Sequence, residues 1–378
     1  MGPYFEMFSI KRFITRSHDP NLRSYLSTFS ERDFSFHTGK DYAYFELKEP
    51  VNFIKACLSV LYIGDPDDIK PIFESILLSR APVVLIKGHT PYLDDYAMEE
   101  LLRYNSICLY RWMYRDKSLA ERLLRKYVER GGTAFIIPFY KGELLGRKFY
   151  LAKSTGNCSQ GYFVNINSSY VDAVFHGVNT TDFAPAIYAG KPWHYIAISG
   201  PSEVLMWIDR NPVLAIDRIG KGKIVWIGFN LPVHVWLYLN PNEAQLIRNI
   251  IEYALHFNSE GWISRFTMEK RPYGYIEINL NLKKAQSLWL LIKEAYFPGW
   301  RASVNGVAVP LQTAEPGLIT LKIGGSSSYK ILLRYEYTEV HYAGWAITIL
   351  TLIAIISMFL LKSRRLVKER SIRAAEKK

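Results

Sequence analysis

Apolar runs of strand length alternate with amphipathic segments between residues 57 and 256. The runs that we expect as buried strands are 58–63, 82–88, 106–112, 133–139, 213–216 and 223–229. The segments with apolar residues every three or four positions, typical of helices, are 67–79, 94–104, 117–130 and 242–256. Strands that alternate with helices indicate a parallel sheet covered on both faces. The pattern therefore predicts a doubly wound α/β domain over residues 56–258, after an N-terminal extension with a strand over residues 1–55.

From Trp262 onward the period of the pattern changes to two. Apolar and polar side chains alternate over residues 276–282, which is typical of a half-buried strand. Asn305-Gly306 separates two short apolar stretches, and both residues tolerate the positive φ of a type I′ hairpin turn. Short alternating strands with turn signals between them predict a small antiparallel β-sandwich over residues 262–340.

Residues 343–361 form an apolar stretch of nineteen residues without a single charge. As a helix rising about 1.5 Å per residue it would span roughly 28 Å, close to the ~30 Å hydrocarbon core of a bilayer. A buried helix of this length in a soluble protein would normally carry a polar stripe. We therefore predict one transmembrane helix over residues 342–361, with the lipid bilayer as its partner.

The residues on either side of this stretch predict its orientation. The basic tail, residues 362–378, contains eight lysines and arginines and two glutamates, while Tyr337, Tyr342 and Trp345 lie at the other end. Basic residues stay on the cytoplasmic side of a membrane, and amphipathic rings favour the headgroup layer. We expect a single-pass protein of the cell membrane, with its N-terminal bulk outside the cytoplasm and its C-terminus inside.

Charge and cysteine usage exclude several classes of function. The formal net charge is +12, and the basic tail supplies half of it, so the large domain is only mildly basic and we expect no nucleic-acid partner. The three cysteines, Cys57, Cys108 and Cys158, form no CxxC pair, and the histidines show no HxH or HExxH spacing. We expect no metal site and no cofactor, with Cys57 and Cys108 as apolar core residues.

Export of the N-terminal bulk needs an explanation, because residues 1–13 contain no apolar run long enough for a signal peptide. One solution is that the chain is the C-terminal portion, or the split partner, of a larger polytopic membrane protein. The other is a tail-anchored protein whose bulk stays in the cytosol, against the charge bias. We favour the first, and Asn-x-Ser/Thr sequons at Asn157, Asn167 and Asn179 give export slight support.

The C-terminal region carries a motif. Residues 296–300 read Tyr-Phe-Pro-Gly-Trp, Asn305-Gly306 follows as a hairpin, and a closing strand leads into the apolar stretch. This pattern resembles the C-terminal β-domain of the YfhO-like membrane proteins over residues 285–361. Those are polytopic proteins assigned to glycosyl transfer onto cell-surface polymers, so the resemblance implies a polytopic membrane protein as partner and a glycan as ligand. The motif itself we interpret as a tight corner with an aromatic plug.

A second resemblance concerns the α/β domain. A helix that ends in Gly131-Gly132 leads into the strand TAFIIPF, and GKGKIVWIGF follows later as a return hairpin. This order is similar to that of class I glutamine amidotransferase-like domains, in which such a strand leads to a Gly-x-Cys-x-Gly nucleophile elbow. The nucleophilic cysteine would fall near Pro138, and Ile136 and Tyr140 replace the flanking glycines. The resemblance therefore implies the scaffold without the amidase activity, because that chemistry needs a thiolate on a sharp turn.

Polar and aromatic side chains follow the expected strands at their carboxyl ends, where open α/β sheets bind ligands. These candidate residues are Asp65, Asp67, Asp68, His89, Asp94, Arg111, Trp112 and Tyr140. Acidic groups beside a histidine and aromatic rings would suit a sugar or a cation. The plainer interpretation is that residues 65–68 cap a helix N-terminus, where side-chain oxygens and negative charge are favoured. We expect capping and solvated loops first, ligand binding second, and no catalytic residue.

Taken as a whole, the sequence predicts a membrane-anchored extracytoplasmic module without catalytic activity. By resemblance it would be the C-terminal part, or the partner, of a polytopic membrane protein in cell-envelope glycan or lipid-linked sugar assembly. A hydrolase or transferase that uses the carboxylates at the strand ends is a rival prediction. A structural cell-surface protein that contacts other envelope components is a third.

Overall fold

The computed structural model describes residues 54–153, 164–183, 194–256, 262–271 and 274–375, together with strand segments at 12–16, 34–38, 42–47, 187–188 and 191–192. The chain divides into two compact units. The first unit comprises residues 1–266, 280–296 and 311–328, and the second comprises residues 267–279, 297–310 and 329–378. Cys158 and Asn157 of the sequence analysis lie outside the described residues.

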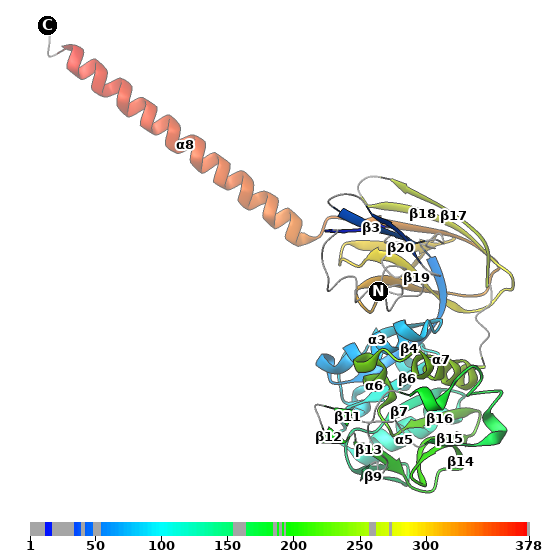
Figure 1. Ribbon diagram of the computed structural model, residues 1–378. Helices are drawn as coiled ribbons and strands as arrows, with labels where there is room; N and C mark the ends of the chain where they lie inside the picture. The colour runs from blue at the N-terminus through cyan, green and yellow to red at the C-terminus, as the bar shows by residue number, and fades with distance from the viewer. Residues whose placement is uncertain are drawn as a thin grey trace. The chain divides into compact units, whose positions relative to one another are not determined.

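The first unit is built on one mixed sheet of eleven strands (Figure 1). In spatial order these are β10 (Val164–Ile166), β14 (Glu203–Ile208), β15 (Asn211–Ile219), β16 (Gly222–Ile227), β7 (Thr133–Ile137), β6 (Ser106–Tyr110), β4 (Ile54–Gly64), β19 (Leu288–Ala295), β23 (Leu318–Ile323), β22 (Gln312–Ala314) and β5 (Val83–Lys87). β5, β4, β6, β7 and β16 pair in parallel. The neighbours on either side of these five, β15 and β19 among them, pair antiparallel.

The predicted fold class is therefore wrong. We expected a doubly wound parallel sheet of the amidotransferase type beside a separate small β-sandwich, and the sheet is mixed instead. β4 is the reason: its first residues, from Ile54 to Cys57, pair antiparallel with β19, and its later residues pair in parallel with β5 and β6. β19 and β23 are buried along most of their length, which suits interior strands of a large sheet better than half-exposed strands of a sandwich.

The strands around β4 also close on themselves. β22 bonds to β5 through Ala314 and Ile86, and β5 bonds to β4, so the order β4-β19-β23-β22-β5 returns to its first member. Closure leaves fewer unpaired strand edges to attract another chain. The sequence contains no signal for the pairing partners of these strands, so the closed order of β4, β19, β23, β22 and β5 was not predicted.

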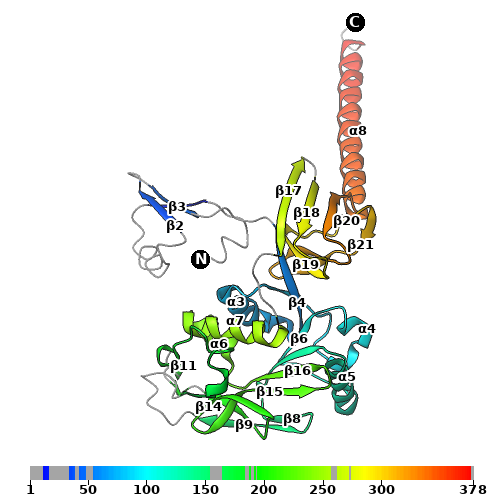
Figure 2. The same cartoon turned by 90° about the vertical axis from the view of Figure 1, so that its right-hand side faces the viewer.

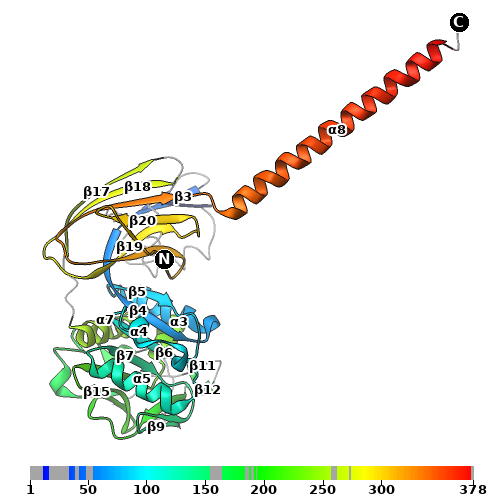
Figure 3. The same ribbon diagram turned by 180° about the vertical axis from the view of Figure 1, so that it is seen from behind.

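Helices cover both faces of the parallel strands (Figures 2 and 3). They are α3 (Ile69–Ser79), α4 (Met98–Leu101), α5 (Lys117–Glu129), α6 (Leu231–Tyr238) and α7 (Pro241–Leu255). α3, α6 and α7 share one buried cluster with the side chains of one sheet face, and α4 and α5 share a second cluster with the other face. Cys57 and Cys108 are 0% and 4% exposed, which confirms them as core residues.

Two smaller sheets and a hairpin complete the strands outside the second unit. β13 (His194–Ile198), β9 (Arg147–Lys153) and β8 (Gly142–Leu144) form an antiparallel sheet. β1 (Arg12–Arg16), β3 (Tyr42–Leu47) and β2 (Phe34–Thr38) form another. β11 (Ile187–Tyr188) and β12 (Lys191–Pro192) pair as a short antiparallel hairpin.

A five-stranded sheet has the order β17 (Ile263–Arg271), β18 (Tyr275–Leu282), β24 (Ser328–Tyr335), β20 (Trp300–Val304), β21 (Val307–Val309). Asn305 and Gly306 have φ values of 50° and 82°, which confirms the predicted hairpin between β20 and β21. Trp300 is 6% exposed, and its backbone N–H donates to the Phe297 carbonyl. A Cβ on Gly299 would lie 2.4 Å from a backbone oxygen. The Phe-Pro-Gly-Trp segment is thus a tight corner that buries its tryptophan, as predicted.

The last element is one long helix, α8 (Glu339–Ala375) (Figure 1). Within residues 339–362 the most apolar window of 18 residues has a mean hydropathy of 2.4, and none of that window is buried inside the protein. Apolar side chains that no part of the protein covers are stable only where something other than water solvates them. By length and composition α8 is therefore a candidate membrane span, compatible with a single-pass anchor.

Candidate functional site

The three aspartates after β4 occupy the positions of a helix N-terminus. Asp65 precedes a 3₁₀ turn at Pro66–Asp68, and its side chain accepts a hydrogen bond from the Asp67 backbone N–H at 3.1 Å. The carbonyl of Asp65 accepts from the Tyr62 hydroxyl at 2.9 Å. The capping interpretation is confirmed for Asp65, while Asp68 has a different partner.

Arg111, at the carboxyl end of β6, contacts two other predicted residues, Asp68 and Tyr140. Its Nη1 lies 2.5 Å from Oδ2 of Asp68, and its Nη2 donates to the Tyr140 hydroxyl at 3.1 Å. The guanidinium also lies 4.8 Å from the ring centre of Phe139. The backbone of Arg111 has φ 51°, a conformation that non-glycine residues rarely adopt outside turns and sites. An ion pair, a phenol and an aromatic face thus hold the guanidinium in one place.

A cavity of about 160 Å³ lies beside this arginine. The residues that line it, here called the Arg111 cavity, are Arg111, Trp112, Tyr114, Phe139, Tyr140, Lys141, Gly142, Glu143 and Phe149. The indole Nε1 of Trp112 is buried and makes no hydrogen bond with any described residue. Such an orphaned donor costs about 1–3 kcal/mol unless something pairs with it. The Arg111 cavity therefore combines aromatic walls with a fixed cation, and Trp112 in its wall keeps a buried N–H without a described partner.

His89 and Asp94 belong to a separate cluster. His89 Nδ1 lies 3.1 Å from Glu100, and its ring packs against Tyr96 at 4.4 Å. Asp94 accepts the backbone N–H groups of Arg115 and Asp116. Desolvation works against it, but these backbone hydrogen bonds lower the pKa of Asp94 below its usual value. Asp94 thus holds the loop after β6, and neither Asp94 nor His89 has a described contact with Arg111.

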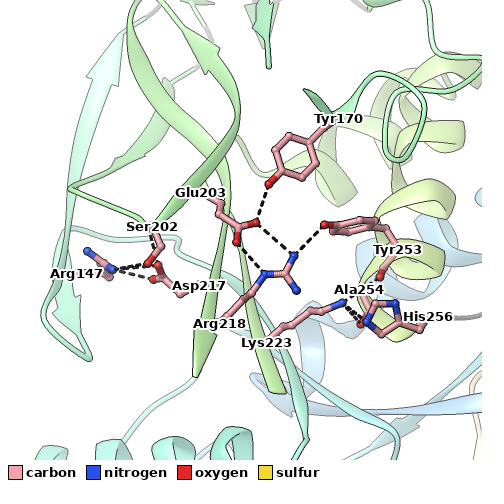
Figure 4. Close-up of polar contacts among 10 residues, drawn as sticks. All are labelled: Arg147, Tyr170, Ser202, Glu203, Asp217, Arg218, Lys223, Tyr253, Ala254 and His256. Atoms are coloured by element: carbon pink, nitrogen blue, oxygen red, sulfur yellow. Dashed lines mark hydrogen bonds and ion pairs between the residues drawn. The ribbon is translucent and has the colours of Figure 1, made fainter. Parts of the chain in front are cut away.

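A polar network that the sequence analysis missed crosses β14, β15 and α7 (Figure 4). Arg218 donates to Glu203 at 2.8 Å and to the Tyr253 hydroxyl at 3.1 Å, and Glu203 accepts from Tyr170 at 2.7 Å. The hydrogen bond from Arg218 lowers the pKa of Glu203. The hydrogen bond to Glu203 in turn raises the pKa of Tyr170 to about 12. The carboxylate is therefore committed as an acceptor at neutral pH.

Lys223 continues this network at the amino end of β16 (Figure 4). Its ammonium donates to the Tyr253 and Ala254 carbonyls at 3.3 and 3.4 Å and lies 2.7 Å from Nε2 of His256. Desolvation, aided by the charge of Arg218, lowers the pKa of Lys223. The charge of Lys223 and then desolvation lower the pKa of His256. Only the Gly-Lys-Gly-Lys turn was visible in the sequence, because the partners lie thirty or more residues away.

Metal binding has no support in the part of the chain that the structure describes, where no three histidine, cysteine or carboxylate side chains converge as ligands would. Cys57 and Cys108 are buried, and desolvation raises the pKa of their thiols to about 11 and about 12. Thiols with raised pKa values are poor nucleophiles and poor metal ligands. These two cysteines therefore serve packing.

Comparison with known proteins finds several partial likenesses. An exo-β-D-glucosaminidase of Pyrococcus horikoshii is 26% identical over 151 residues, which is 37% of this chain and 17% of that protein. Cytoplasmic protein STM3548 of Salmonella typhimurium has a TM-score of 0.35 at 16% identity, over 52% of this chain and 99% of the other. A GH42 β-galactosidase, Gan42B of G. stearothermophilus, has a TM-score of 0.28 at 9% identity, over 77% of this chain and 41% of the other.

The chain thus spans about a sixth of the length of the curated relative that it matches. Residues 76–234 match a family that is described as a domain of unknown function, DUF8560. This match contains both β6 and β7, which position the Arg111 cavity, and β14 to β16 with most of the polar network.

Proposed function

We propose that the chain is a membrane-anchored, extracytoplasmic module that binds a saccharide in the Arg111 cavity. In this role it would act as the C-terminal part, or the partner, of a polytopic membrane protein in cell-envelope glycan or lipid-linked sugar assembly. The proposal has two halves, a ligand and a location, and different observations support each.

The observation that carries the ligand is an aromatic cavity beside an arginine whose guanidinium is held by Asp68 and Tyr140. Sugar rings present apolar C–H faces that pack on aromatic rings and hydroxyls that both donate and accept. Phe139 and Tyr140 supply faces, while Arg111 supplies a cationic N–H donor group. At about 160 Å³ the cavity is smaller than the ~300 Å³ or more of a drug-sized site, so it suits a single ring and not a long chain.

A sugar is also the ligand class suggested by the curated relative, whose name is exo-β-D-glucosaminidase. The YfhO-like resemblance of residues 285–361 points in the same direction, toward glycosyl transfer at the cell surface. Neither likeness extends over the whole chain. For that reason the proposal is a binding role and not an enzyme of either kind.

The location rests on α8 and the charges that follow it. The span from Glu339 to Lys362 is apolar enough to cross a bilayer. The basic tail after it favours the cytoplasmic side by the positive-inside rule, which leaves the bulk of the chain outside. Tyr337 and Tyr342, at 62% and 64% exposed, suit the opposite headgroup layer.

The carboxylates that the rival enzyme prediction would use already form hydrogen bonds or an ion pair within the protein. Asp65 caps a turn, Asp68 pairs with Arg111, and Asp94 holds two backbone N–H groups. A glycosidase of the usual kind needs two carboxylates that flank one bond. Among the described residues that line the Arg111 cavity, Glu143 is the acidic one. The binding role therefore accounts for more of the observed contacts than the rival prediction does.

A glycan array tests the ligand directly, with the full chain in detergent micelles. Tyr140→Ala removes an exposed ring and the acceptor of Arg111, and we expect it to weaken binding of the preferred saccharide about tenfold, or about 1.4 kcal/mol. The matched control is Tyr150→Ala, since Tyr150 is also an exposed tyrosine but does not line the cavity. Equal binding by both variants, or no saccharide bound by the unaltered chain, would refute the proposal.

A further inference from the structure

A second cavity, of about 380 Å³, lies at the amino ends of the parallel strands, away from the Arg111 cavity. The residues that line it, here called the Lys223 cavity, are Leu58, Asn105, Gly131, Thr133, Lys221, Gly222, Lys223, Ala254, Leu255, His256, Trp262, Gln286, Ser287 and Leu288. All belong to the first compact unit. Nothing in the proposed saccharide role uses this cavity, and its lining has a different chemistry.

Two glycines in the turn between β15 and β16 place its lysines. Gly220 has φ 59°, and a Cβ there would meet the Glu129 backbone at 2.7 Å. A Cβ on Gly222 would lie 2.2 Å from the carbonyl oxygen of Gly132. The turn therefore packs directly on the end of α5 and the start of β7. This close approach sets Lys221 and Lys223 at the rim and in the wall of the cavity.

The hydrogen bonds of Lys223 determine the tautomer of His256. Lys223 is 6% exposed, and a lysine ammonium can only donate, so Nε2 of His256 must accept. A neutral imidazole that accepts at Nε2 carries its proton on Nδ1. His256 thus retains one N–H donor. The same Lys223 ammonium also satisfies two carbonyls at the end of α7, where a positive charge is favourable.

Capping of α7 explains the three bonds of Lys223 but not the rest of the cavity. Lys221 is exposed and takes no part in the α7 cap. The side-chain oxygen of Asn105 accepts hydrogen bonds from the backbone N–H and the hydroxyl of Ser59, while its amide nitrogen has no acceptor among the described residues. Gln286 and Ser287 add further donors from the opposite wall. A cavity that needed only to close a helix end would not need polar walls.

The charge of the Lys223 cavity has one sign. Its described lining holds two lysines and a histidine and no carboxylate. Glu203, the carboxylate that acts on Lys223, is itself held by Arg218 and Tyr170. Lys223 and His256 both have lowered pKa values, which is the expected response to uncompensated positive charge and desolvation. An anion in the cavity would relieve both.

We propose that the Lys223 cavity binds a small oxyanion, either a phosphate group or a carboxylate. The charge would be balanced by Lys221 and Lys223, and an oxygen would accept the N–H of His256. Oxyanions bind where several N–H donors and cations converge in a partly desolvated site. The inference is independent of saccharide binding in the Arg111 cavity, which needs neither lysine.

Isothermal titration of the full chain in detergent micelles tests this inference near neutral pH. Inorganic phosphate and D-glucuronate are the two probes, with chloride as the competing anion in every buffer. We expect saturable binding of at least one probe, and its identity distinguishes a phosphate from a carboxylate site. Lys221→Gln and His256→Gly should each weaken binding about tenfold, since the first removes a cation and the second removes an N–H donor. Glycine is chosen because it has no side-chain donor and tolerates the φ of 50° at position 256.

The matched control is Lys148→Gln, which removes an exposed lysine from β9 outside the cavity and should leave the affinity unchanged. Circular dichroism melting curves of all three variants confirm that each is folded. Binding that is equal in the unaltered chain, Lys221→Gln and His256→Gly would overturn the inference, and so would the absence of saturation with both probes. Either outcome would leave Lys223 as a helix cap alone.

Discussion

Replacing Asp217 with asparagine tests a second polar cluster, in which Asp217 contacts Arg147, Ser202 and Trp226. Asp217 lies on β15 and is 4% exposed. It accepts from Nε and Nη2 of Arg147, each at 2.9 Å, from the Ser202 backbone N–H at 2.7 Å and from Nε1 of Trp226 at 2.9 Å. These contacts link β9 to β15 and β16. The carboxylate thus has four donors around two oxygens.

The cost of Asp217→Asn follows from this geometry. Asparagine keeps one acceptor oxygen, but its NH₂ group would face one N–H of Arg147 together with the N–H of either Ser202 or Trp226, so two donors lose their partner. Breaking a buried ion pair costs about 3–5 kcal/mol. Arg147 is 27% exposed, and water can solvate part of its guanidinium, so we expect the lower end, about 3 kcal/mol. That is a large share of the ~5–15 kcal/mol by which a domain is stable.

Urea unfolding of the full chain in detergent micelles, followed by tryptophan fluorescence, measures this difference. The control is Asp172→Asn, the same substitution at an exposed aspartate outside this cluster, which should change the free energy of unfolding by less than about 0.5 kcal/mol. If Asp217→Asn proved as stable as the control, the four hydrogen bonds would not stabilise the fold as described, and the reasoning would be wrong.

Three further predictions concern stability and reactivity. Gly222→Ala should destabilise the protein by about 2 kcal/mol or more, because its Cβ would lie 2.2 and 2.3 Å from two backbone oxygens. The control is Gly146→Ala, at φ 79° with open space around it, which should cost only about 1 kcal/mol in the same urea unfolding experiment. In a chain with Cys158→Ser, Cys57 and Cys108 should react with a maleimide only after unfolding, since burial raises the pKa of both thiols; rapid labelling of that variant in its native state would contradict this. Desolvation opposes the shift, but hydrogen bonds lower the pKa of Asp217 in the folded state. Its contribution is therefore complete above the unfolded pKa of about 3.9 and is lost as the pH falls below it, so acid unfolding of Asp217→Asn should show a weaker pH dependence.

Local patterns predicted local structure well. The spacing of apolar residues gave α3, α5 and α7 to within a few residues, and Asn305-Gly306 gave its hairpin. The helix expected over residues 94–104 is shorter in the structure and comprises only α4. Asp94 lies outside it, because its side chain accepts hydrogen bonds from the backbone N–H groups of Arg115 and Asp116. Each of these results depends on residues close together in the chain.

Pairing between distant segments was beyond the sequence. The sequence around Trp289 contains no signal that β19 pairs antiparallel with β4, where Trp289 lies opposite Cys57, so the mixed sheet was not predicted. The contacts of the candidate residues were unpredictable for the same reason. Arg111 donates a hydrogen bond to Tyr140 at the end of a neighbouring strand, while His89 pairs with Glu100. Lys223 and His256 form a pair that only the tertiary fold creates.

Protease treatment of intact cells tests the proposed location most directly. A protease recognition sequence inserted after Gly325, in the exposed turn between β23 and β24, would provide a cleavage site outside the membrane span. The account predicts that protease added outside intact cells cleaves this site and leaves α8 with its basic tail protected. Cleavage only after the cells are lysed would place the bulk of the chain in the cytosol and contradict the account.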